Sequence, residues 1–297
     1  MLKKYVVLFI VFSIWITAIL SADLLDDLEK FGETNGKKYL EPFAEVLTTS
    51  MNTGWFSVAK GGMMHFGFCV NPMITIIPDD AKTFTASSPD TSLYEENEIE
   101  SATVFGDKGG TFHGVIPGTY LTLPDGINLS TFPFLVPQAH IGLPSGIDVE
   151  IRFFPEVEIS KDIGKFTYWG LGIKNQVSKF IPLCPVAIAV QGTYQQFSLG
   201  DYIEMNTTYF NVHASKSLVV VPLTVYGGVG VENSTLTAKY DYAGAIPGID
   251  EIKFDIETES NMKITLGTRL KLLIFDLMAD YSISKYNTFR LGVGASF

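Results

Sequence analysis

The second half of the chain alternates between apolar and polar residues with a period of two. In the stretch GIDVEIRFF, Ile147, Val149 and Ile151 fall on one face, and charged residues fall between them. This is the period of a β-strand with one apolar and one polar side. The same alternation recurs almost to the last residue, so the sequence predicts that residues 61–297 form a β-domain.

The lengths of the alternating runs distinguish between two kinds of β-domain. A soluble sandwich also alternates, but its strands average five or six residues, whereas a tilted strand needs about ten to cross a bilayer. Several runs reach about that length. At roughly 18 to 20 residues per strand and connection, the chain after Lys60 predicts about 12 strands, with 10 to 14 plausible. We therefore expect an all-β, antiparallel transmembrane barrel with a helical segment at its N-terminus.

The last strand carries a further signal. In NTFRLGVGASF the residues on the predicted lipid face are Phe289, Leu291, Val293, Ala295 and Phe297. A terminal aromatic residue after such an alternation resembles the C-terminal signal by which bacterial outer-membrane barrels are recognised for insertion. The alternative is a soluble sheet whose last strand happens to end in phenylalanine. The pattern favours the bacterial outer membrane, with its lipids and its barrel-assembly machinery as partners.

The N-terminus has the layout of a secretory signal peptide over residues 1–22. Lys3 and Lys4 precede an apolar run that ends in small residues, and acidic residues begin at Asp23. The alternative is a permanent membrane helix, since the run is almost long enough to span a bilayer. Residues 23–60 then show apolar residues at helical spacing, and we expect one or two short amphipathic helices, broken around Gly36, that plug the barrel or lie at its mouth.

The polar faces of the strands supply a set of charges that should point into the lumen. Mixed signs on adjacent strands favour cross-strand ion pairs that fill and rigidify a barrel interior. The predicted lumen-facing charges are Asp148, Glu150, Arg152, Lys239, Asp241, Lys253, Asp255, Lys263, Arg269, Lys271, Asp276, Asp280 and Arg290.

Composition narrows the classes of partner. The formal net charge is −11, so no basic surface is expected to hold nucleic acid. The mean hydropathy is +0.23, which fits apolar residues distributed over strands. Cys69 and Cys184 are far apart in sequence and allow either a disulfide or two unpaired, packed thiols.

Candidate chemistry is sparse. His213 and Ser215 share one face of a strand, with Asn211 two residues earlier, which is the pattern of a base beside a nucleophile. Their apolar neighbours should face lipid, so the pair should point into the lumen, whereas outer-membrane lipases need it exposed to lipid. The remaining histidines lack metal-ligand spacing, and YGGVGV lies in a strand pattern rather than before a helix. We predict no catalytic residues, no metal and no cofactor.

Several segments together resemble a family of uncharacterised bacterial outer-membrane barrels, distantly similar to long-chain fatty-acid transporters of the FadL type. The segments are YLEPFAEVLTTSMNTGWFSVA, GLPSGIDVEIRFFP, TVYGGVGVE, NMKITLGTRLKLL and ADYSISKYNTFRLGVGASF. The resemblance implies a plug-like N-terminal segment and passage of an apolar solute. The leading hypothesis is therefore passive transport of a small hydrophobic or amphipathic ligand. The alternatives are a structural or surface-interaction barrel and, third, a lipid hydrolase that uses His213 and Ser215.

Overall fold

The structure of the protein is a computed structural model that describes residues 32–62, 65–160, 164–218, 221–241 and 251–297. The predicted signal peptide at residues 1–22 and the start of the predicted helical segment lie outside these residues. Among the described residues, no helix is both long and apolar enough to cross a membrane.

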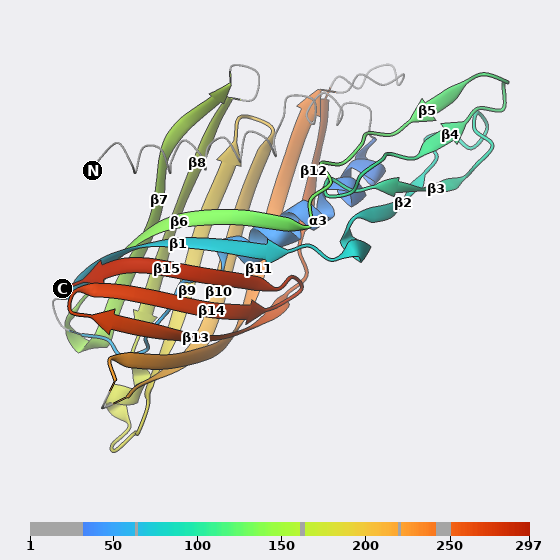
Figure 1. Ribbon diagram of the computed structural model, residues 1–297. Helices are drawn as coiled ribbons and strands as arrows, with labels where there is room; N and C mark the ends of the chain where they lie inside the picture. Colours follow the sequence, from blue (N-terminus) through green and yellow to red (C-terminus); the bar gives the residue numbers. More distant parts are fainter. Residues whose placement is uncertain (1–31, 63–64, 161–163, 219–220, 242–250) are drawn as a thin grey trace.

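Antiparallel strands form a closed barrel (Figure 1). Its wall consists of β1 (Phe66–Ile76), β6 (Thr131–Gly142), β7 (Ile147–Ser160), β8 (Gly164–Asn175), β9 (Ala187–Leu199), β10 (Ile203–Ser217), β11 (Leu223–Asp241), β13 (Asn261–Leu272), β14 (Phe275–Ile283) and β15 (Thr288–Ser296). Among the described residues, the sheet holds 11 strands, and the β10–β11 pairing closes ten of them into a ring. The remaining strand, β12 (Glu251–Glu257), pairs only with the far part of β11.

The expected number of about 12 wall strands is too high, and the observed ring of ten lies at the lower limit of the predicted range. The reason is a long excursion between β1 and β6. Residues 79–130 form an arm that adds no strand to the wall and contains η1 (Asp79–Ala81), β2 (Thr83–Ser87), β3 (Glu98–Ala102), β4 (Thr111–His113) and β5 (Tyr120–Thr122). The pairs β2–β3 and β4–β5 form two small sheets of their own.

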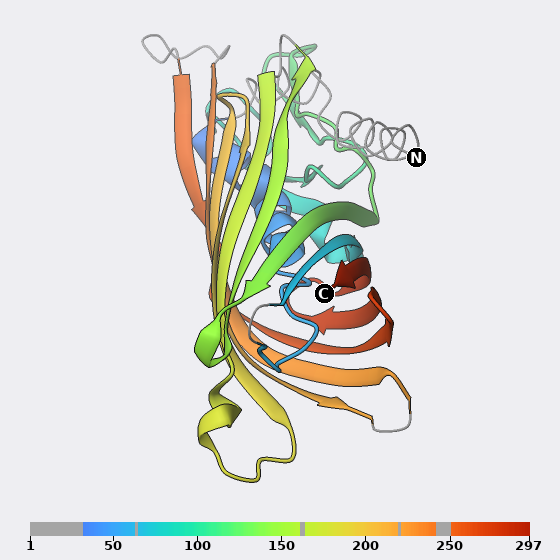
Figure 2. The ribbon, with the colours of Figure 1, turned by 90° about the vertical axis from the view of Figure 1, so that its left-hand side faces the viewer.

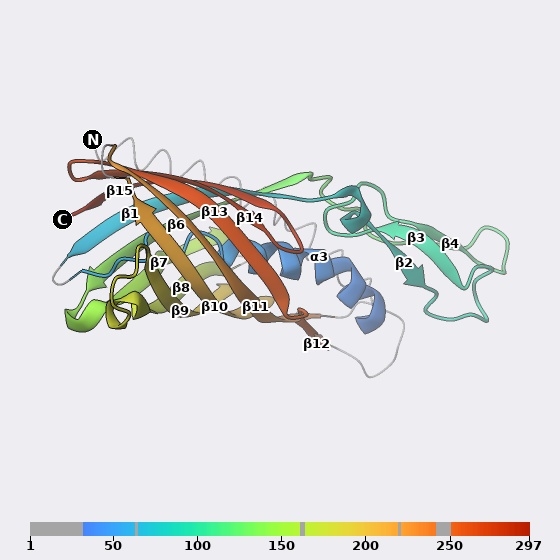
Figure 3. The same cartoon turned by 90° about the horizontal axis from the view of Figure 1, so that it is seen from below.

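The two ends of the barrel differ, and we call them the arm end and the turn end. The arm projects beyond one end, and the C-terminus lies at the other (Figure 3). The turn end carries η2 (Pro144–Gly146), η3 (Val177–Phe180) and the tight β13–β14 turn at Leu273. Leu273 has a φ of 59°, the left-handed region in which tight turns reverse a chain.

The first and last strands close the ring. β1 pairs with β15 from Gly67 to Val70 and from Met73 to Thr75. At the turn end, the Phe297 amide donates to the Phe66 carbonyl at 2.8 Å, and the Phe66 amide donates to the Phe297 carbonyl at 3.2 Å. The two rings stack with centroids 5.1 Å apart. The aromatic end of the chain therefore completes the seam of the barrel.

Helix α3 (Glu33–Met51) lies inside the barrel, between the long strands β7–β11 and the arm (Figure 2). The apolar residues expected at helical spacing, Leu40, Phe43 and Leu47, are buried in the core. The expected break at Gly36 is wrong, because the helix runs through it. Gly36 is instead a close-approach position, since a Cβ there would lie 2.6 Å from the Tyr240 hydroxyl.

An apolar belt covers the outer face of the barrel. On β11 the outward-facing residues near the turn end are Val225, Val229 and Val231, all of them exposed. Further along, the outward positions turn polar at Asn233 and Thr235. A band of exposed aliphatic and aromatic side chains on a closed barrel is the surface that lipid covers.

Beyond this belt the inward and outward faces exchange character, which corrects part of the lumen-facing set. Lys239, Lys253 and Asp255 are exposed on the outer face, while the alternating residues Tyr240, Ile252 and Phe254 point inward and are buried on the side of α3. The expectation failed because strands with apolar-out and apolar-in faces have the same period. Asp241 lies at a position whose side chain is outside the described set.

Candidate functional site

The lumen is occupied by a single stretch of chain, residues 33–62, which we call the plug segment. At the arm end, Asn35 Nδ2 donates to the Ser87 carbonyl at 2.8 Å, and the Ser87 amide donates back to Asn35 Oδ1 at 3.0 Å. At the turn end, the Gly61 amide donates to Gln176 Oε1 at 2.8 Å. The plug segment therefore runs the length of the barrel.

Arg152 on β7 holds the middle of the plug segment. Its guanidinium donates to the carbonyls of Met51 at 2.6 Å and Thr53 at 2.8 Å, and to Gln138 Oε1 at 2.9 Å. The same group lies 4.0 Å from the centroid of the Trp55 ring, a cation–π distance. Its side chain is fully buried, so these contacts replace its hydration.

Two further cations, from β13 and β15, complete the clamp. Arg290 on β15 donates to the Gly54 carbonyl at 3.1 Å, and Lys263 on β13 donates to the Thr49 carbonyl at 2.7 Å. The last carbonyls of a helix have no partner within it, and they carry the negative end of its dipole. The wall therefore holds the C-terminal end of α3 and the residues directly after it with three buried positive charges, here called the cationic clamp: Arg152, Lys263 and Arg290.

Buried carboxylates balance two of these charges, those of Lys263 and Arg290, and the charge of a further buried cation, Lys174. Arg290 pairs with Asp280 at 2.6 Å, Lys263 pairs with Glu232 at 3.3 Å, and Lys174 pairs with Asp148 at 2.7 Å. The members of the predicted lumen set that lie inside the barrel are Asp148, Glu150, Arg152, Lys263, Arg269, Asp276, Asp280 and Arg290, with Lys271 at the mouth. The backbone carbonyls that the clamp binds have no signature in a residue pattern, so sequence reasoning missed them.

At the arm end, hydrogen bonds and aromatic contacts hold the plug segment against the base of the arm. The Tyr39 hydroxyl donates to the Asp125 carbonyl at 2.9 Å, and the Val104 amide donates to the Tyr39 carbonyl at 3.1 Å. The Phe43 ring lies between Phe105 and Phe132, with centroid distances of 6.4 and 6.3 Å. The base of the arm thus packs on α3 and closes this end with an aromatic core.

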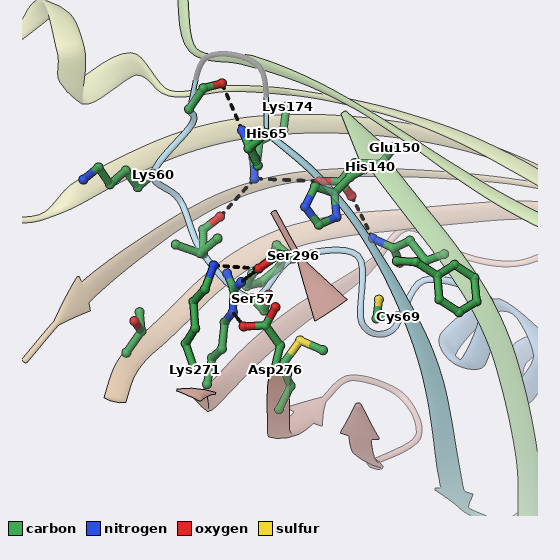
Figure 4. A pocket seen from close by; sticks show the side chains of 18 of the residues that line it. Ser57, Lys60, His65, Cys69, His140, Glu150, Lys174, Lys271, Asp276 and Ser296 are labelled. Atoms are coloured by element: carbon green, nitrogen blue, oxygen red, sulfur yellow. Dashed lines mark hydrogen bonds and ion pairs between the residues drawn. The ribbon is translucent and has the colours of Figure 1, made fainter. Parts of the chain in front are cut away.

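At the turn end, the plug segment leaves a cavity of about 380 Å³ that is lined by charged, polar and apolar side chains (Figure 4). Its walls come from the plug segment after α3 and from strands on both sides of the seam. Its labelled polar side chains are Ser57, Lys60, His65, His140, Glu150, Lys174, Lys271, Asp276 and Ser296. The rings of His65 and His140 approach to 5.5 Å between centroids, a proximity that their sequence separation did not suggest.

The possible hydrolase pair points into the lumen, but each member is engaged elsewhere. Ser215 Oγ accepts a hydrogen bond from the Ala59 amide at 2.8 Å. The His213 ring stacks on Phe56 at 4.2 Å, and its Nδ1 lies 2.7 Å from Asn211 Oδ1. The serine oxygen is therefore held by the plug segment backbone and is shielded from lipid.

The remaining candidate groups lie in separate places. Cys69 is buried on β1 and Cys184 lies after η3, and both thiols are free. In the arm, hydrogen bonds from the backbone N–H and the ring of His113 hold the pKa of the Glu96 carboxyl below its usual range. Within the described ranges, no cluster of three or more His, Cys, Asp or Glu side chains is placed to hold a metal ion.

Known structures with some similarity include three proteins of low identity. They are Ail, the attachment invasion locus protein of Yersinia pestis (10% identity, TM-score 0.28), the β domain of the Bordetella autotransporter BrkA (9%, 0.37) and a loop-deletion mutant of OmpT, an outer membrane protein of Vibrio cholerae (13%, 0.29). Each match covers 80% of this chain and 100% of the other. None of the three is a FadL-type transporter, so that part of the resemblance stays an expectation.

No curated protein matches the sequence. A family model matches residues 1–297, the full length. The chain belongs to that family, which is described as a family of unknown function, DUF6588.

Proposed function

We propose that this protein is an integral outer-membrane β-barrel that passes a small amphipathic solute passively and is gated by its plug segment. The observation that carries the proposal is that the lumen is filled by a separate stretch of chain. In a narrow barrel the side chains of the wall fill the interior by themselves. Here the wall is wide enough to hold a helix, which is about 10 Å across, so displacement of the plug segment leaves a path of that width.

The lining of that path supports an amphipathic solute. The wall near the arm end presents aromatic side chains such as Phe154, Phe166 and Tyr168, whereas the wall near the turn end presents the buried charges. A molecule with one apolar and one polar part finds a matching surface in each half. The apolar belt and the seam completed by Phe297 support placement in the outer membrane and assembly through the C-terminal strand.

Uptake by lipid vesicles tests the proposal. The purified full chain is reconstituted, and entry of an isotopically labelled alkyl sulfonate, which stays charged and crosses lipid slowly, is compared with that into empty vesicles. We expect faster entry with the protein, and a further increase when the plug segment is loosened by Arg152→Met. Entry equal to that of empty vesicles for both proteins would refute transport.

A second function is favoured by the closure of the arm end. The arm and α3 share an aromatic core there, and no solute is needed to explain it. A structural or surface-interaction barrel would keep this seal permanently and act through the arm. It predicts no uptake by either protein, together with altered adhesion or envelope integrity when the gene is deleted.

A further inference from the structure

Strand β12 leaves one edge of the sheet open at the arm end. Among the described residues, β12 pairs with residues 235–241 of β11 and with no strand on its other side. Figure 2 shows it at the margin of the row of long strands. The outer face at this height is already polar, from Asn233 and Thr235 onward, so β12 lies beyond the apolar belt and water can hydrate its open edge.

The backbone groups at this edge can be assigned from the neighbouring hydrogen bonds. The Thr258 amide donates to the Ser234 carbonyl of β11 at 3.0 Å, whereas the Lys239 amide of β11 points away from β12 and donates to the Tyr202 carbonyl at 2.8 Å. Successive residues of an antiparallel strand bond alternately to its two sides. The even-numbered residues of β12 therefore bond to β11. The odd-numbered residues present their N–H and C=O groups at the open edge: Glu251, Lys253, Asp255 and Glu257.

The side chains of β12 are arranged symmetrically about Phe254. The strand reads EIKFDIE, which is the same in both directions except that Lys253 on one side corresponds to Asp255 on the other. Lys253 and Asp255 are exposed on the outer face, and Phe254 is buried on the inner face. In an antiparallel pair of two β12 strands with all residues aligned, Lys253 of each copy lies opposite Asp255 of the other. The open edge is therefore complementary to itself.

The charges on this edge differ from those that protect an edge strand. Natural edges are often blunted by charged residues that repel a second strand. Here the aligned register forms two pairs of opposite sign, and such cross-strand pairs are stabilising. Glu251 then lies opposite Glu257, but Glu251 is already paired with Lys239 at 2.8 Å. A shift of two residues in either direction shortens the ladder and places Lys253 or Asp255 opposite itself, so the aligned register is favoured.

The symmetry of such a pair fixes the orientation of the two barrels. Identical antiparallel strands are related by a two-fold axis perpendicular to their sheet. The sheet here is the wall of the barrel, so this axis is perpendicular to the barrel axis, and the rotation reverses the barrel. The two copies then point in opposite directions and meet at their arm ends. Barrels in one membrane share one orientation, so this pairing joins copies in two apposed membranes.

We propose that the open edge of β12 binds a second copy of this chain in an apposed membrane, by antiparallel strand pairing with two Lys253–Asp255 ion pairs. The inference goes beyond passive transport and needs no solute. In outer-membrane barrels the long connections lie outside the cell, and the arm is such a connection, so the contact joins neighbouring cells. One short strand buries less surface than a standard interface, so each contact is weak and many copies act together.

Sedimentation of the full chain in nanodiscs, one barrel to a disc and with empty nanodiscs as blank, tests the pairing. Native protein should form pairs of discs as its concentration rises. Lys253→Asp places acidic residues opposite Asp255 at both ion pairs, and Asp255→Lys places lysines opposite Lys253. Each variant should weaken the association at least about fivefold, because attraction becomes repulsion at both positions.

A charge exchange supplies the rescue. The double variant Lys253→Asp/Asp255→Lys restores both ion pairs with their signs reversed and should associate to within about threefold of the native protein. An equimolar mixture of the two single variants should also associate, because each supplies the charges that the other needs. Lys165→Asp, which reverses an exposed charge on β8, is the control for net charge and should leave the association unchanged. Gel migration of unboiled protein checks that each variant has assembled.

Each outcome decides on the pairing. Association that is lost in both single variants and recovered in the double variant and in the mixture would support it. Native discs that stay single at all concentrations would overturn it, as would equal association of the native protein and Lys253→Asp. A folded double variant that associates no better than the single variants would also overturn it, since only the aligned register predicts the rescue.

Discussion

Removing the guanidinium of Arg152 should unlock the plug segment. Arg152→Met keeps an unbranched chain of similar length over Trp55 but deletes the donors to Met51, Thr53 and Gln138. The carbonyls of Met51, the last residue of α3, and of Thr53 then lose their partner in the wall, while the wall strands keep their ladder. The change therefore acts on the docking of the plug segment more than on the barrel.

The structure sets the magnitude. Each of the three hydrogen bonds involves a charged donor and is worth about 1.5–3 kcal/mol, so their simple sum is an upper bound of about 9 kcal/mol. The three acceptors left behind are neutral, and a buried acceptor without its donor costs about 1–3 kcal/mol, so the loss of all three contacts costs about 3–9 kcal/mol. At the lower value the ratio of undocked to docked plug segment rises roughly 100-fold.

Conductance across a planar bilayer measures that ratio directly. The native protein should stay closed almost all the time, and Arg152→Met should raise the open fraction by about two orders of magnitude. Lys165→Met is the matched control, because Lys165 forms an exposed ion pair with Glu156 at 2.7 Å that is worth about 1 kcal/mol at most. A folded Arg152→Met protein whose conductance equals that of the control would show that the plug segment does not gate the lumen.

Three further predictions concern the plug segment and the seam. Gly54→Ala should lower the free energy of unfolding by about 1–3 kcal/mol in thermal melts, because Gly54 has a φ of 78° and its new Cβ would lie 2.6 Å from Arg290 Cδ. Gly118→Ala is the control, because Gly118 has a φ of 87° but lies in open space. Equal melting of the two variants would contradict the steric argument. Burial raises the pKa of Glu45 above 4.5 despite its 2.7 Å pair with Lys285. The contribution of Glu45 to stability is therefore full below pH 4.5 and is lost as the pH rises through the raised pKa. Glu45→Gln should flatten this loss in melts from about pH 4 to about pH 8, and parallel curves for the two proteins would refute the prediction. Deletion of Phe297 should reduce the fraction of folded barrel in the outer membrane more than Phe275→Ala does, as measured by gel migration of unboiled membranes, and equal fractions would argue against a terminal signal.

The sequence predicted the barrel because the physical cause of the strands is local. A period of two, a run length of about ten and a phase change at a turn are all readable from neighbouring residues, as around Leu273. Within residues 110–145, Pro133 and Pro137 argue against a wall strand, because proline cannot donate to a central ladder. The structure resolves this, since β6 pairs with β1 alone along that part and β7 joins only from Gln138 onward.

The direction of each face could be predicted only where lipid decides it. Ile151 and Phe153 face outward as expected. Lys253 and Asp255, which were expected in the lumen, also face outward, because α3 supplies an apolar surface inside the barrel at that height. A sequence pattern does not reveal whether a strand face meets lipid, water or another part of the protein. The clamp was hidden for a different reason, because its acceptors are backbone carbonyls of a segment far away in sequence.

The path of the plug segment through the lumen has a consequence for the order of assembly. The segment enters at the arm end, leaves at the turn end and leads directly into β1, which the last strand then covers. If the ring closed first, the free end of the chain would have to be pulled through the whole pore past the cationic clamp. Wrapping the strands around a segment already in place avoids this threading. Formation of the β1–β15 seam is then the irreversible step that encloses the plug segment, and the folded barrel surrounds a segment of its own chain.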